Sequence, residues 1–332
     1  MAVLPQMFGD YELRERLGVG GMAETFVAVR RGPAGFQQRV CLKRVLGTFQ
    51  DDPEFIEMFL RESRLSALLH HNHIARVLDF GVVEGAHYLT LELIEGTDLR
   101  RLLSSLREYG ERLDPELVIH LARALASALD FAHTADDNGR AAGIVHRDVS
   151  PSNVLLSYAG EVKLADFGIA KRTHRPDSLQ STALKGKIPY MAPEYAIGRH
   201  YDARTDLFSL GVLLYECLAG RRPFDGENDI ETLERARRGE WEPLTWFAGD
   251  ASALLVDTIE SLLRSDRMDR PPNAGALLDR LAPLRIDPLT RRSLADEVRH
   301  CTQRGRIPSA PGLASTRPIS TRRPRKRRPS QH

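Results

Sequence analysis

The stretch that most constrains this chain runs from His146 to Asn153 and is followed by an Asp-Phe-Gly triplet that begins at Asp166. It places the carboxylate of Asp148 five residues before the amide of Asn153, and the triplet adds a second carboxylate thirteen residues further on. One carboxylate can orient a hydroxyl group, and the other can bind Mg²⁺ together with the amide oxygen. This spacing therefore indicates a phosphoryl-transfer site.

Hydrophobic periodicity predicts a small sheet with one helix before this motif and a largely helical region around and after it. Strands are expected over residues 11–17, 25–30, 39–44, 77–83 and 87–93. Residues 53–70 carry apolar side chains at helical spacing, and residues 115–133 form the longest amphipathic stretch. Further helices are expected up to about residue 284. Residues 134–142 are polar and contain glycine, which predicts a surface loop.

The length and composition suit a globular chain with a substantial core. The 332 residues are 42% hydrophobic and 28% charged, which fits one two-lobed domain or two compact ones. The net charge is +2, but the last 32 residues contain nine Arg or Lys and no acid, so the first 300 carry about −7. The basic balance therefore belongs to the C-terminal end.

The C-terminal end is predicted to be a basic, disordered tail. Residues 307–332 are dominated by Pro, Ser, Thr and Arg, with too few large apolar side chains to offset their ordering entropy. The run from Arg322 to Arg328 could bind an acidic partner protein, nucleic acid or an anionic membrane, or could remain a solvated basic end. Residues 286–306 could add one more helix, and residues 1–10 are a short N-terminal extension.

The sequence favours a cytoplasmic location. Cys41, Cys217 and Cys301 are widely spaced and form neither a disulfide framework nor a metal-ligand cluster, which is typical of a reducing compartment. The N-terminus lacks the basic-then-apolar order of a signal peptide. The longest apolar run, over residues 210–219, contains Glu216 and is too short to cross a bilayer, so no transmembrane segment is expected.

A glycine-rich segment lies between the first two predicted strands. Glycine lets backbone amides approach phosphate oxygens without a Cβ in the way, although such a turn is often a plain hairpin. The candidate nucleotide-binding residues here are Leu17, Gly18, Val19, Gly20, Gly21, Ala23 and Thr25. The distance from this segment to the next strand, which carries Lys43, supports the nucleotide interpretation.

Together these segments resemble a eukaryotic-type Ser/Thr protein kinase of the bacterial kind. The resemblance rests on the glycine-rich segment, the 146–153 run, the Asp-Phe-Gly triplet and an Ala-Pro-Glu sequence that ends at Glu194, all in the family's order and spacing. It covers about residues 11–285 and implies an α+β fold with two lobes. The small, β-rich N-lobe with one major helix would span residues 11–94, and the larger, mostly helical C-lobe would span residues 95–285.

The resemblance assigns several N-lobe residues to ATP binding. Lys43 would contact the α- and β-phosphates, and Glu62, on the predicted helix, would pair with Lys43 and orient it. The backbone of Glu92 and of Ile94 would bond to adenine. Asp98 matches the acid that contacts the ribose, although it could equally be the N-cap of a helix that begins at the next residue.

In the C-lobe the resemblance makes Asp148 the base or orienter of the substrate hydroxyl. Asn153 and Asp166 would be the Mg²⁺ ligands, because an ion that also binds phosphate needs few protein oxygens. ATP and Mg²⁺ are therefore the implied nucleotide and metal. Glu194 with Arg270 resembles the buried ion pair of the family's C-lobe.

One position departs from the family, because most Ser/Thr kinases have lysine where this chain has Ser150. The missing cation would touch the transferring phosphoryl group, so its loss could leave a catalytically weak or silent nucleotide-binding scaffold. Lys187, however, stands where the family usually has threonine beside the catalytic aspartate. We hypothesise that Lys187 is a catalytic residue that returns the charge. The alternative is a solvated loop lysine.

The acceptor class and the mode of regulation are predicted from the same region. Pro151 resembles the Ser/Thr kinase pattern, so Ser or Thr hydroxyls of proteins are the expected acceptors, and the Ala-Pro-Glu sequence disfavours a small-molecule kinase. Arg147 could bind a phosphate on the activation segment and so order that segment. The available phosphorylation sites are Thr173, Ser178, Ser181 and Thr182.

Overall fold

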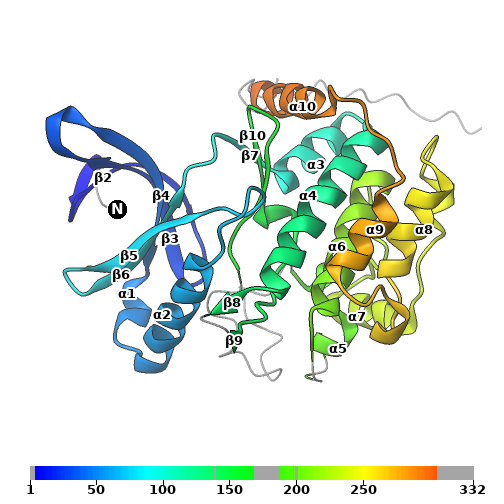
Figure 1. Cartoon of the computed structure of the whole chain (residues 1–332), viewed down its shortest axis with the longest axis horizontal. Helices are drawn as coiled ribbons and strands as arrows, with labels where there is room; N and C mark the ends of the chain where they lie inside the picture. The colour runs from blue at the N-terminus through cyan, green and yellow to red at the C-terminus, as the bar shows by residue number, and fades with distance from the viewer. Residues whose placement is uncertain (1–3, 138–139, 168–186, 197, 199–200, 305–332) are drawn as a thin grey trace, which may run out of the picture.

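The chain folds into a β-rich part and a helical part that meet at a pocket (Figure 1). The computed structural model describes residues 4–137, 140–167, 187–196, 198 and 201–304. One large apolar cluster fills the helical part, and two smaller clusters lie in the β-rich part. This arrangement confirms the predicted α+β fold with two lobes.

The N-lobe is a six-stranded antiparallel sheet with the order β1-β2-β3-β4-β6-β5. Its strands are β1 (Gln6–Phe8), β2 (Tyr11–Val19), β3 (Ala23–Arg31), β4 (Gln37–Val45), β5 (Val77–Val83) and β6 (Ala86–Glu92). In β1, Phe8 pairs with Tyr11 and packs its ring edge-on against Tyr88. Residues 6–8 of the predicted N-terminal extension are therefore part of the sheet.

One long helix packs on this sheet. The helices of the lobe are α1 (Gly47–Gln50) and α2 (Pro53–Ala67). Helix α2 begins where the side chain of Asp52 accepts a hydrogen bond from Phe55 N at 3.1 Å. Phe55 and Phe59, one turn apart, are buried in a cluster with Leu89 and Leu91 of β6. The apolar face of α2 is thereby docked on the sheet.

The C-lobe is built around helix α6, which is buried from Thr205 to Ala219. The helices of this lobe are α3 (Leu99–Glu108), α4 (Pro115–His133), α5 (Pro193–Ala196), α6 (Arg204–Ala219), α7 (Asp229–Arg238), α8 (Ala253–Leu262), α9 (Ala274–Leu281) and α10 (Thr290–Arg304). A Cβ on Gly211 would lie 2.6 Å from Leu262 Cβ, so the glycine allows α6 and α8 to pack closely. Within the described ranges, no helix has both the length and the apolarity that a membrane span requires.

A small three-stranded sheet, ordered β11-β10-β7, positions Asn153 and Asp166 in the lining of the pocket. Its strands are β7 (Gly96–Asp98), β10 (Val154–Ser157) and β11 (Val162–Leu164). Asn153 directly precedes β10, and Asp166 follows β11 by two residues. Because β10 and β11 are antiparallel, with Val154 opposite Leu164, Asn153 and Asp166 lie at the same end of the pair.

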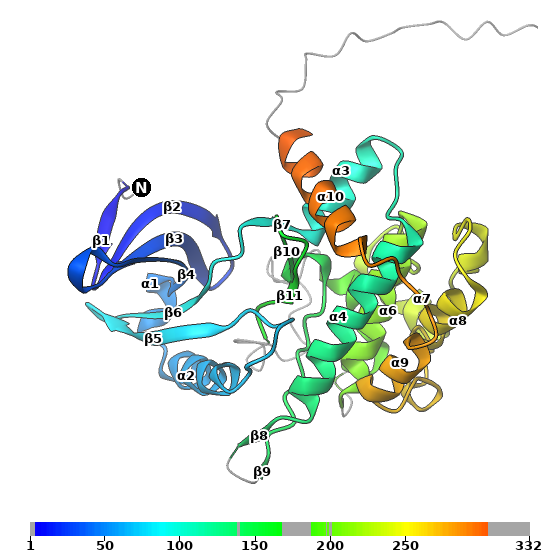
Figure 2. The same cartoon turned by 45° about the horizontal axis from the view of Figure 1, so that its top comes forward.

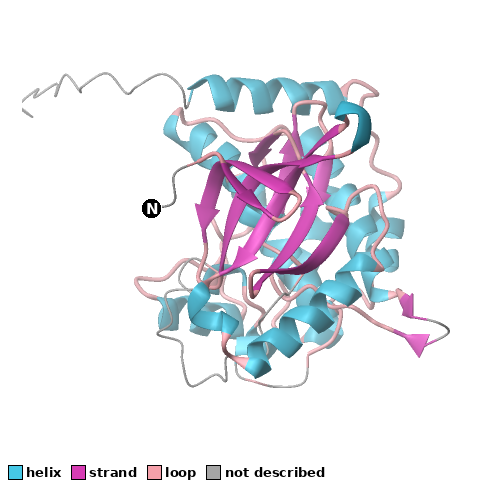
Figure 3. Cartoon of the chain, turned by 90° about the vertical axis from the view of Figure 1, so that its left-hand side faces the viewer, coloured by secondary structure: helices cyan, strands magenta, loops and turns pink. Residues whose placement is uncertain are grey.

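The segment between α4 and the catalytic run differs from the expected surface loop. It contains two short paired strands, β8 (Asp136–Asp137) and β9 (Arg140–Ala141). They form a hairpin that projects from the end of α4 (Figure 3). The hairpin lies outside the main body of the C-lobe.

Helix α10 packs across α3, α4 and β7 (Figure 2). Leu294, Val298 and Cys301 recur at helical spacing and form its buried face. Arg304, at its end, pairs with Glu111 at 2.8 Å. The helix lies in the stretch where one more helix is predicted, and it is an integral part of the C-lobe.

Candidate active site

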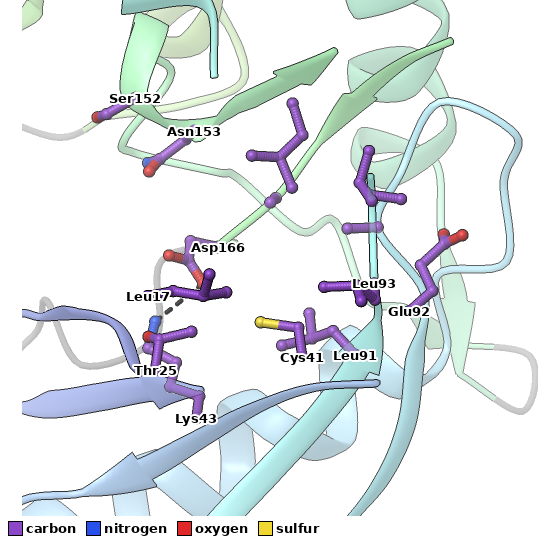
Figure 4. A pocket seen from close by; sticks show the side chains of 14 residues that line it. Leu17, Thr25, Cys41, Lys43, Leu91, Glu92, Leu93, Ser152, Asn153 and Asp166 are labelled. Atoms are coloured by element: carbon purple, nitrogen blue, oxygen red, sulfur yellow. Dashed lines mark hydrogen bonds and ion pairs between the residues drawn. The ribbon is translucent and has the colours of Figure 1, made fainter. Parts of the chain in front are cut away.

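A pocket opens between the two lobes, at the place where the sequence predicts an ATP site (Figure 4). It is lined by Leu17, Thr25, Cys41, Lys43, Ala75, Leu91, Glu92, Leu93, Ile94, Ser152, Asn153, Leu155, Ala165 and Asp166. Lys43, Asn153 and Asp166 gather at one end, and Leu91 and Leu93 lie at the other (Figure 4). The pocket thus has a charged end and an apolar end.

The pocket lining includes side chains that the motif analysis did not single out, among them Cys41 and Leu155. Cys41 lies two residues before Lys43 on β4, so strand alternation places both side chains on one face of the sheet. That alternation is a signal from which Cys41 could have been identified. Burial, together with the nearby carboxylate of Asp166, raises the pKa of the Cys41 thiol to about 12. The thiol is therefore neutral at pH 7 and acts as an apolar lining group.

Glu92, at the end of β6, ties the segment between the lobes to both of them. Its carboxylate accepts hydrogen bonds from Arg76 N at 2.9 Å and from Lys163 Nζ, on β11, at 2.7 Å. Its own backbone N–H donates to Arg76 O at 2.9 Å. These bonds hold the main chain that leads to Ile94 at the edge of the pocket.

Lys43 reaches across the pocket, and its Nζ donates to Asp166 Oδ1 at 2.8 Å. Desolvation in the cleft disfavours the charge of Asp166 although 42% of its side chain is accessible, but the ammonium groups of Lys43 and Lys187 outweigh this. The pKa of Asp166 is therefore lowered. Burial opposes the charge of Lys43 as well, yet the carboxylate of Asp166 raises the pKa of Lys43. Both groups are charged at neutral pH.

The predicted pairing of Lys43 with Glu62 is not the arrangement that the structure shows. In the described parts of the chain no ion pair joins these two residues, because the ammonium of Lys43 lies against Asp166 of the opposite lobe. Glu62, on α2, makes an interaction of its own. A Lys43–Glu62 ion pair therefore remains a prediction, and it would require α2 to lie in a different position.

Asp206, fully buried on α6, anchors the backbone that leads into the catalytic run. It accepts hydrogen bonds from the backbone N–H groups of His146 and Arg147, each at 2.7 Å, and from His133 Nε2 at 2.8 Å. Burial opposes its charge, but these partners outweigh burial and lower the pKa of Asp206. Arg147 has a φ of +62°, a strained value for a side chain of this size, and the anchor holds this turn beside Asp148.

Asn153 links the two motif segments. Its Nδ2 donates to Asp148 O at 2.8 Å, which leaves its Oδ1 as a potential metal ligand. Its backbone carbonyl accepts a hydrogen bond from Ala165 N at 2.8 Å, directly before Asp166. The structure thus brings together Asp148, Asn153 and Asp166, the three residues whose spacing indicates a phosphoryl-transfer site.

Lys187 forms an ion pair with Asp148, through Lys187 Nζ and Asp148 Oδ2. Lys187 directly precedes the short 3-10 helix Ile188–Tyr190. Ser150 is buried, and its Oγ lies 3.1 Å from Ser152 Oγ. Lys187 therefore places a cation beside the catalytic-loop aspartate, and this arrangement differs from the alternative of a purely solvated loop lysine.

Comparison with known proteins agrees with this geometry. The model of the protein kinase domain matches residues 11–280. This chain belongs to the protein kinase family. The predicted resemblance and the predicted fold are thereby confirmed.

Similar proteins are bacterial kinases. Tyrosine-protein kinase MasK of Myxococcus xanthus is 38% identical over 279 residues, which make up 84% of this chain and 43% of MasK. Serine/threonine-protein kinase PknA of Mycobacterium tuberculosis is 36% identical over 284 residues, 83% of this chain and 62% of PknA. This chain thus spans less than two thirds of the length of these two relatives. The crystal structure of the Mycobacterium tuberculosis PknI kinase domain matches with a TM-score of 0.62 and 27% identity, covering 85% of this chain and 99% of that domain.

The buried ion pair expected in the C-lobe of the kinase is present. Arg270 Nη1 and Nη2 each lie 2.8 Å from one carboxylate oxygen of Glu194, and the Arg270 side chain has no accessible surface. The guanidinium stacks 4.8 Å above the ring of Phe208 on α6. Burial opposes the charge of Glu194, but Arg270 outweighs it and lowers the pKa of Glu194. This pair ties the end of the activation segment to the core.

The other predicted residues either are not among those that line the pocket or lie outside the described ranges. Asp98 is the N-cap of α3, where its Oδ1 accepts a hydrogen bond from Arg101 N at 3.0 Å. The N-cap alternative is therefore present, and a ribose contact of Asp98 remains a prediction. Gly20 N donates to Ala23 O at 2.8 Å and closes the turn between β2 and β3. Gly21 also lies in this turn, while Gly18 and Val19 are the last two residues of β2. Thr173, Ser178, Ser181 and Thr182 lie outside the described residues.

Proposed function

We propose that this protein transfers the γ-phosphoryl group of ATP to Ser or Thr hydroxyl groups of protein substrates. The observation that carries the proposal is that Lys43, Asn153 and Asp166 line one pocket. Asp148 adjoins them, because its backbone oxygen accepts a hydrogen bond from Asn153 Nδ2. One lysine, one amide and two carboxylates are the groups that protein kinases use to bind Mg²⁺-ATP and to orient the acceptor hydroxyl. Membership of the protein kinase family supports the same reaction.

The apolar end of the pocket suits a purine base. The backbone N–H of Glu92 already donates a hydrogen bond to Arg76 O. The carbonyl oxygen of Glu92 would therefore accept a hydrogen bond from the amino group of adenine at this edge. The N–H of Ile94 would donate to the ring. Leu17 and Leu155 come from different lobes and would cover the two faces of the base.

The charged end suits the triphosphate. Lys43 would bind the α- and β-phosphates once they compete for its contact with Asp166. The donor set of Asn153 Oδ1 and the Asp166 carboxylate fits Mg²⁺, which prefers hard oxygen ligands. Bound there, Mg²⁺ would neutralise phosphate charge and orient the γ-phosphoryl group. Asp148 would accept a hydrogen bond from the substrate hydroxyl and align it for in-line attack.

The acceptor class is supported by Pro151 in the catalytic loop and by relatives named as serine/threonine-protein kinases. MasK, by contrast, is named a tyrosine-protein kinase. Phosphoamino-acid analysis of a protein substrate labelled with [γ-³²P]ATP would separate these classes. We expect phosphoserine and phosphothreonine. Phosphotyrosine alone would contradict the proposed acceptor.

A second candidate is a nucleotide-binding scaffold that transfers little or no phosphate, and the observation that favours it is Ser150. Radiolabelled transfer to the protein itself or to a generic basic substrate decides between the two, with Asp166→Asn as the control. We expect transfer by the wild type and loss in the control. ATP binding measured by calorimetry, without transfer, would support the scaffold instead.

Regulation by phosphorylation of the activation segment is part of the proposal. Arg147, which would bind such a phosphate, packs its guanidinium 4.8 Å from the ring centre of Tyr201, seven residues after Glu194. Mass spectrometry of active protein should find phosphate on at least one of the predicted sites. A fully active preparation without any phosphate would reject regulation by phosphorylation.

The cytoplasm is the proposed location, in keeping with three free cysteines. Binding of acidic partners by the basic tail remains a prediction.

A further inference from the structure

The catalytic loop has no cation at the place where the family usually has one. Ser150 is 2% exposed, and its hydroxyl is hydrogen-bonded to Ser152. No other residue from Ser150 to Asn153 carries a charge. Arg147, the cation of the same loop, packs its guanidinium against the ring of Tyr201, so we expect a cation at the transferring group to come from another segment.

The chain around Lys187 is anchored to the core of the C-lobe. Tyr190 N donates to Lys187 O at 3.0 Å, and Ile188 is buried. Tyr190 OH donates to the buried carboxylate of Glu216 on α6. These contacts tie the backbone of residues 187–190 to the core of the C-lobe.

The ammonium of Lys187 faces the reaction centre. It is ion-paired with Asp148, and its charge also acts on the carboxylate of Asp166. A phosphoryl group in transit between a nucleotide at Asp166 and a hydroxyl at Asp148 must pass between these two carboxylates. Among the described residues, Lys187 is paired with the carboxylate at one end of this path and Lys43 with the carboxylate at the other.

We infer that Lys187 is a catalytic residue that supplies, from the end of the activation segment, the positive charge that Ser150 cannot supply from the catalytic loop. This inference rests on the proposed function. During transfer the substrate oxygen bonds to the γ-phosphorus, the bond from that phosphorus to the β–γ bridging oxygen breaks, and ADP leaves. The hydroxyl proton passes to Asp148. Lys187 keeps its proton and donates hydrogen bonds to the phosphoryl oxygens as their negative charge shifts.

The first test is a set of exchanges at the two positions. Lys187→Ala should lower kcat by about 10²–10³-fold, the effect of removing one preorganised donor from a transition state, while the KM for ATP changes little. The double variant Ser150→Lys with Lys187→Thr restores the usual arrangement of the family and should recover most of the lost rate. Lys185→Ala, two residues earlier in the same segment, is the matched control and should keep the wild-type rate.

The second test is a binding measurement. Calorimetry with ADP, Mg²⁺ and aluminium fluoride, which together imitate the transferring group, should show weaker binding to Lys187→Ala by about tenfold or more. Binding of ADP with Mg²⁺ alone should be unchanged. Thermal unfolding of each variant separates these effects from misfolding, and Lys187→Thr replaces Lys187→Ala if the latter does not fold.

The outcomes distinguish the inference from the proposed function. Full activity of Lys187→Ala overturns the inference and leaves the kinase assignment intact. The inference is also overturned if both Lys187→Ala and the double variant lose activity and also lose ADP binding. Such a result would mean that Lys187 maintains the structure of the site. A wild type without transfer activity refutes the proposed function instead.

Discussion

Gly160 and Arg291 are in backbone contact, and this contact joins the turn between β10 and β11 to helix α10. Gly160 has a φ of +72°, and a Cβ built on it would lie 1.9 Å from Arg291 O. Arg291 Nε also donates to Ala159 O at 3.0 Å in the same turn. Because β10 follows directly on Asn153, helix α10 supports one wall of the candidate active site.

Helix α10 should contribute substantially to the stability of the kinase. Leu294 on its buried face has no accessible surface, so Leu294→Ala should lower the free energy of unfolding by about 2–5 kcal/mol. Leu289, just before the helix, is 61% exposed, and Leu289→Ala is the matched control with an effect of about 0.5 kcal/mol or less. Urea unfolding followed by circular dichroism measures both. Equal losses in the two variants would contradict the packing described.

The Glu194–Arg270 pair should be costly to break. Arg270→Ala leaves the carboxylate of Glu194 buried without its partner and should lower the free energy of unfolding by about 3–5 kcal/mol. Arg237→Ala removes an exposed ion pair with Glu234 and should cost about 1 kcal/mol or less. Chemical denaturation compares the two variants. A small loss for Arg270→Ala would show that water or another group can replace the guanidinium.

Stability should fall in acid because two buried carboxyls have lowered pKa values. The ordinary values are 4.5 for Glu194 and 3.8 for Asp206, and both are lower in the folded chain. Such groups stabilise the folded state above their unfolded pKa, and the stabilisation is lost as the pH falls toward the folded pKa. Their contribution should be constant from pH 7 to about 5 and then decline. Urea unfolding at several pH values tests this, and a flat or rising stability below about pH 4 would contradict it.

A comparison variant isolates the part due to Asp206. Asp206→Asn cannot ionise, so its stability should start lower at pH 7 and change less between pH 5 and pH 3. An acid slope identical to that of the wild type would show that Asp206 has no role in the loss.

Lys43 should be needed for phosphoryl transfer and not for folding. Lys43→Met removes the cation at the charged end of the pocket and should lower kcat/KM by at least about 10²-fold, with little change in Tm. Arg39→Met, on the same strand, removes an exposed ion pair with Glu95 and serves as the control. Steady-state phosphorylation assays compare the two variants. An equal loss of kcat/KM in both would show that disturbing strand β4, and not removing the Lys43 cation, lowers the activity.

The local motifs were predictable because their chemistry resides in short stretches of sequence. Asp148 and Asn153 are five residues apart on one loop, so their proximity needs no knowledge of the rest of the fold. The helix over 53–67 was predictable from its apolar spacing, and its start was set by Asp52. Asp98 shows the limit of such motifs, because the same carboxylate suits a ribose contact and an N-cap, and the structure contains the cap.

Long-range partners were predictable only where a family pattern supplied them. The sequence alone placed Lys43 on a strand and Glu62 on a helix, but the distance between them depends on how α2 sits against the sheet. In the structure the ammonium of Lys43 lies instead against Asp166, 123 residues away in sequence. Small energy differences between alternative ion pairs decide which contact forms. These energy differences depend on the positions of whole helices and strands.

The sequence by itself determined the kinase family, the two lobes and the identity of the acidic and amide groups, because these follow from residue types at fixed short spacings. Only the tertiary structure decided that Lys187 meets Asp148 and that α10 belongs to the C-lobe. Each of these depends on packing between segments far apart in the chain, where burial and backbone contact set the distances between charges.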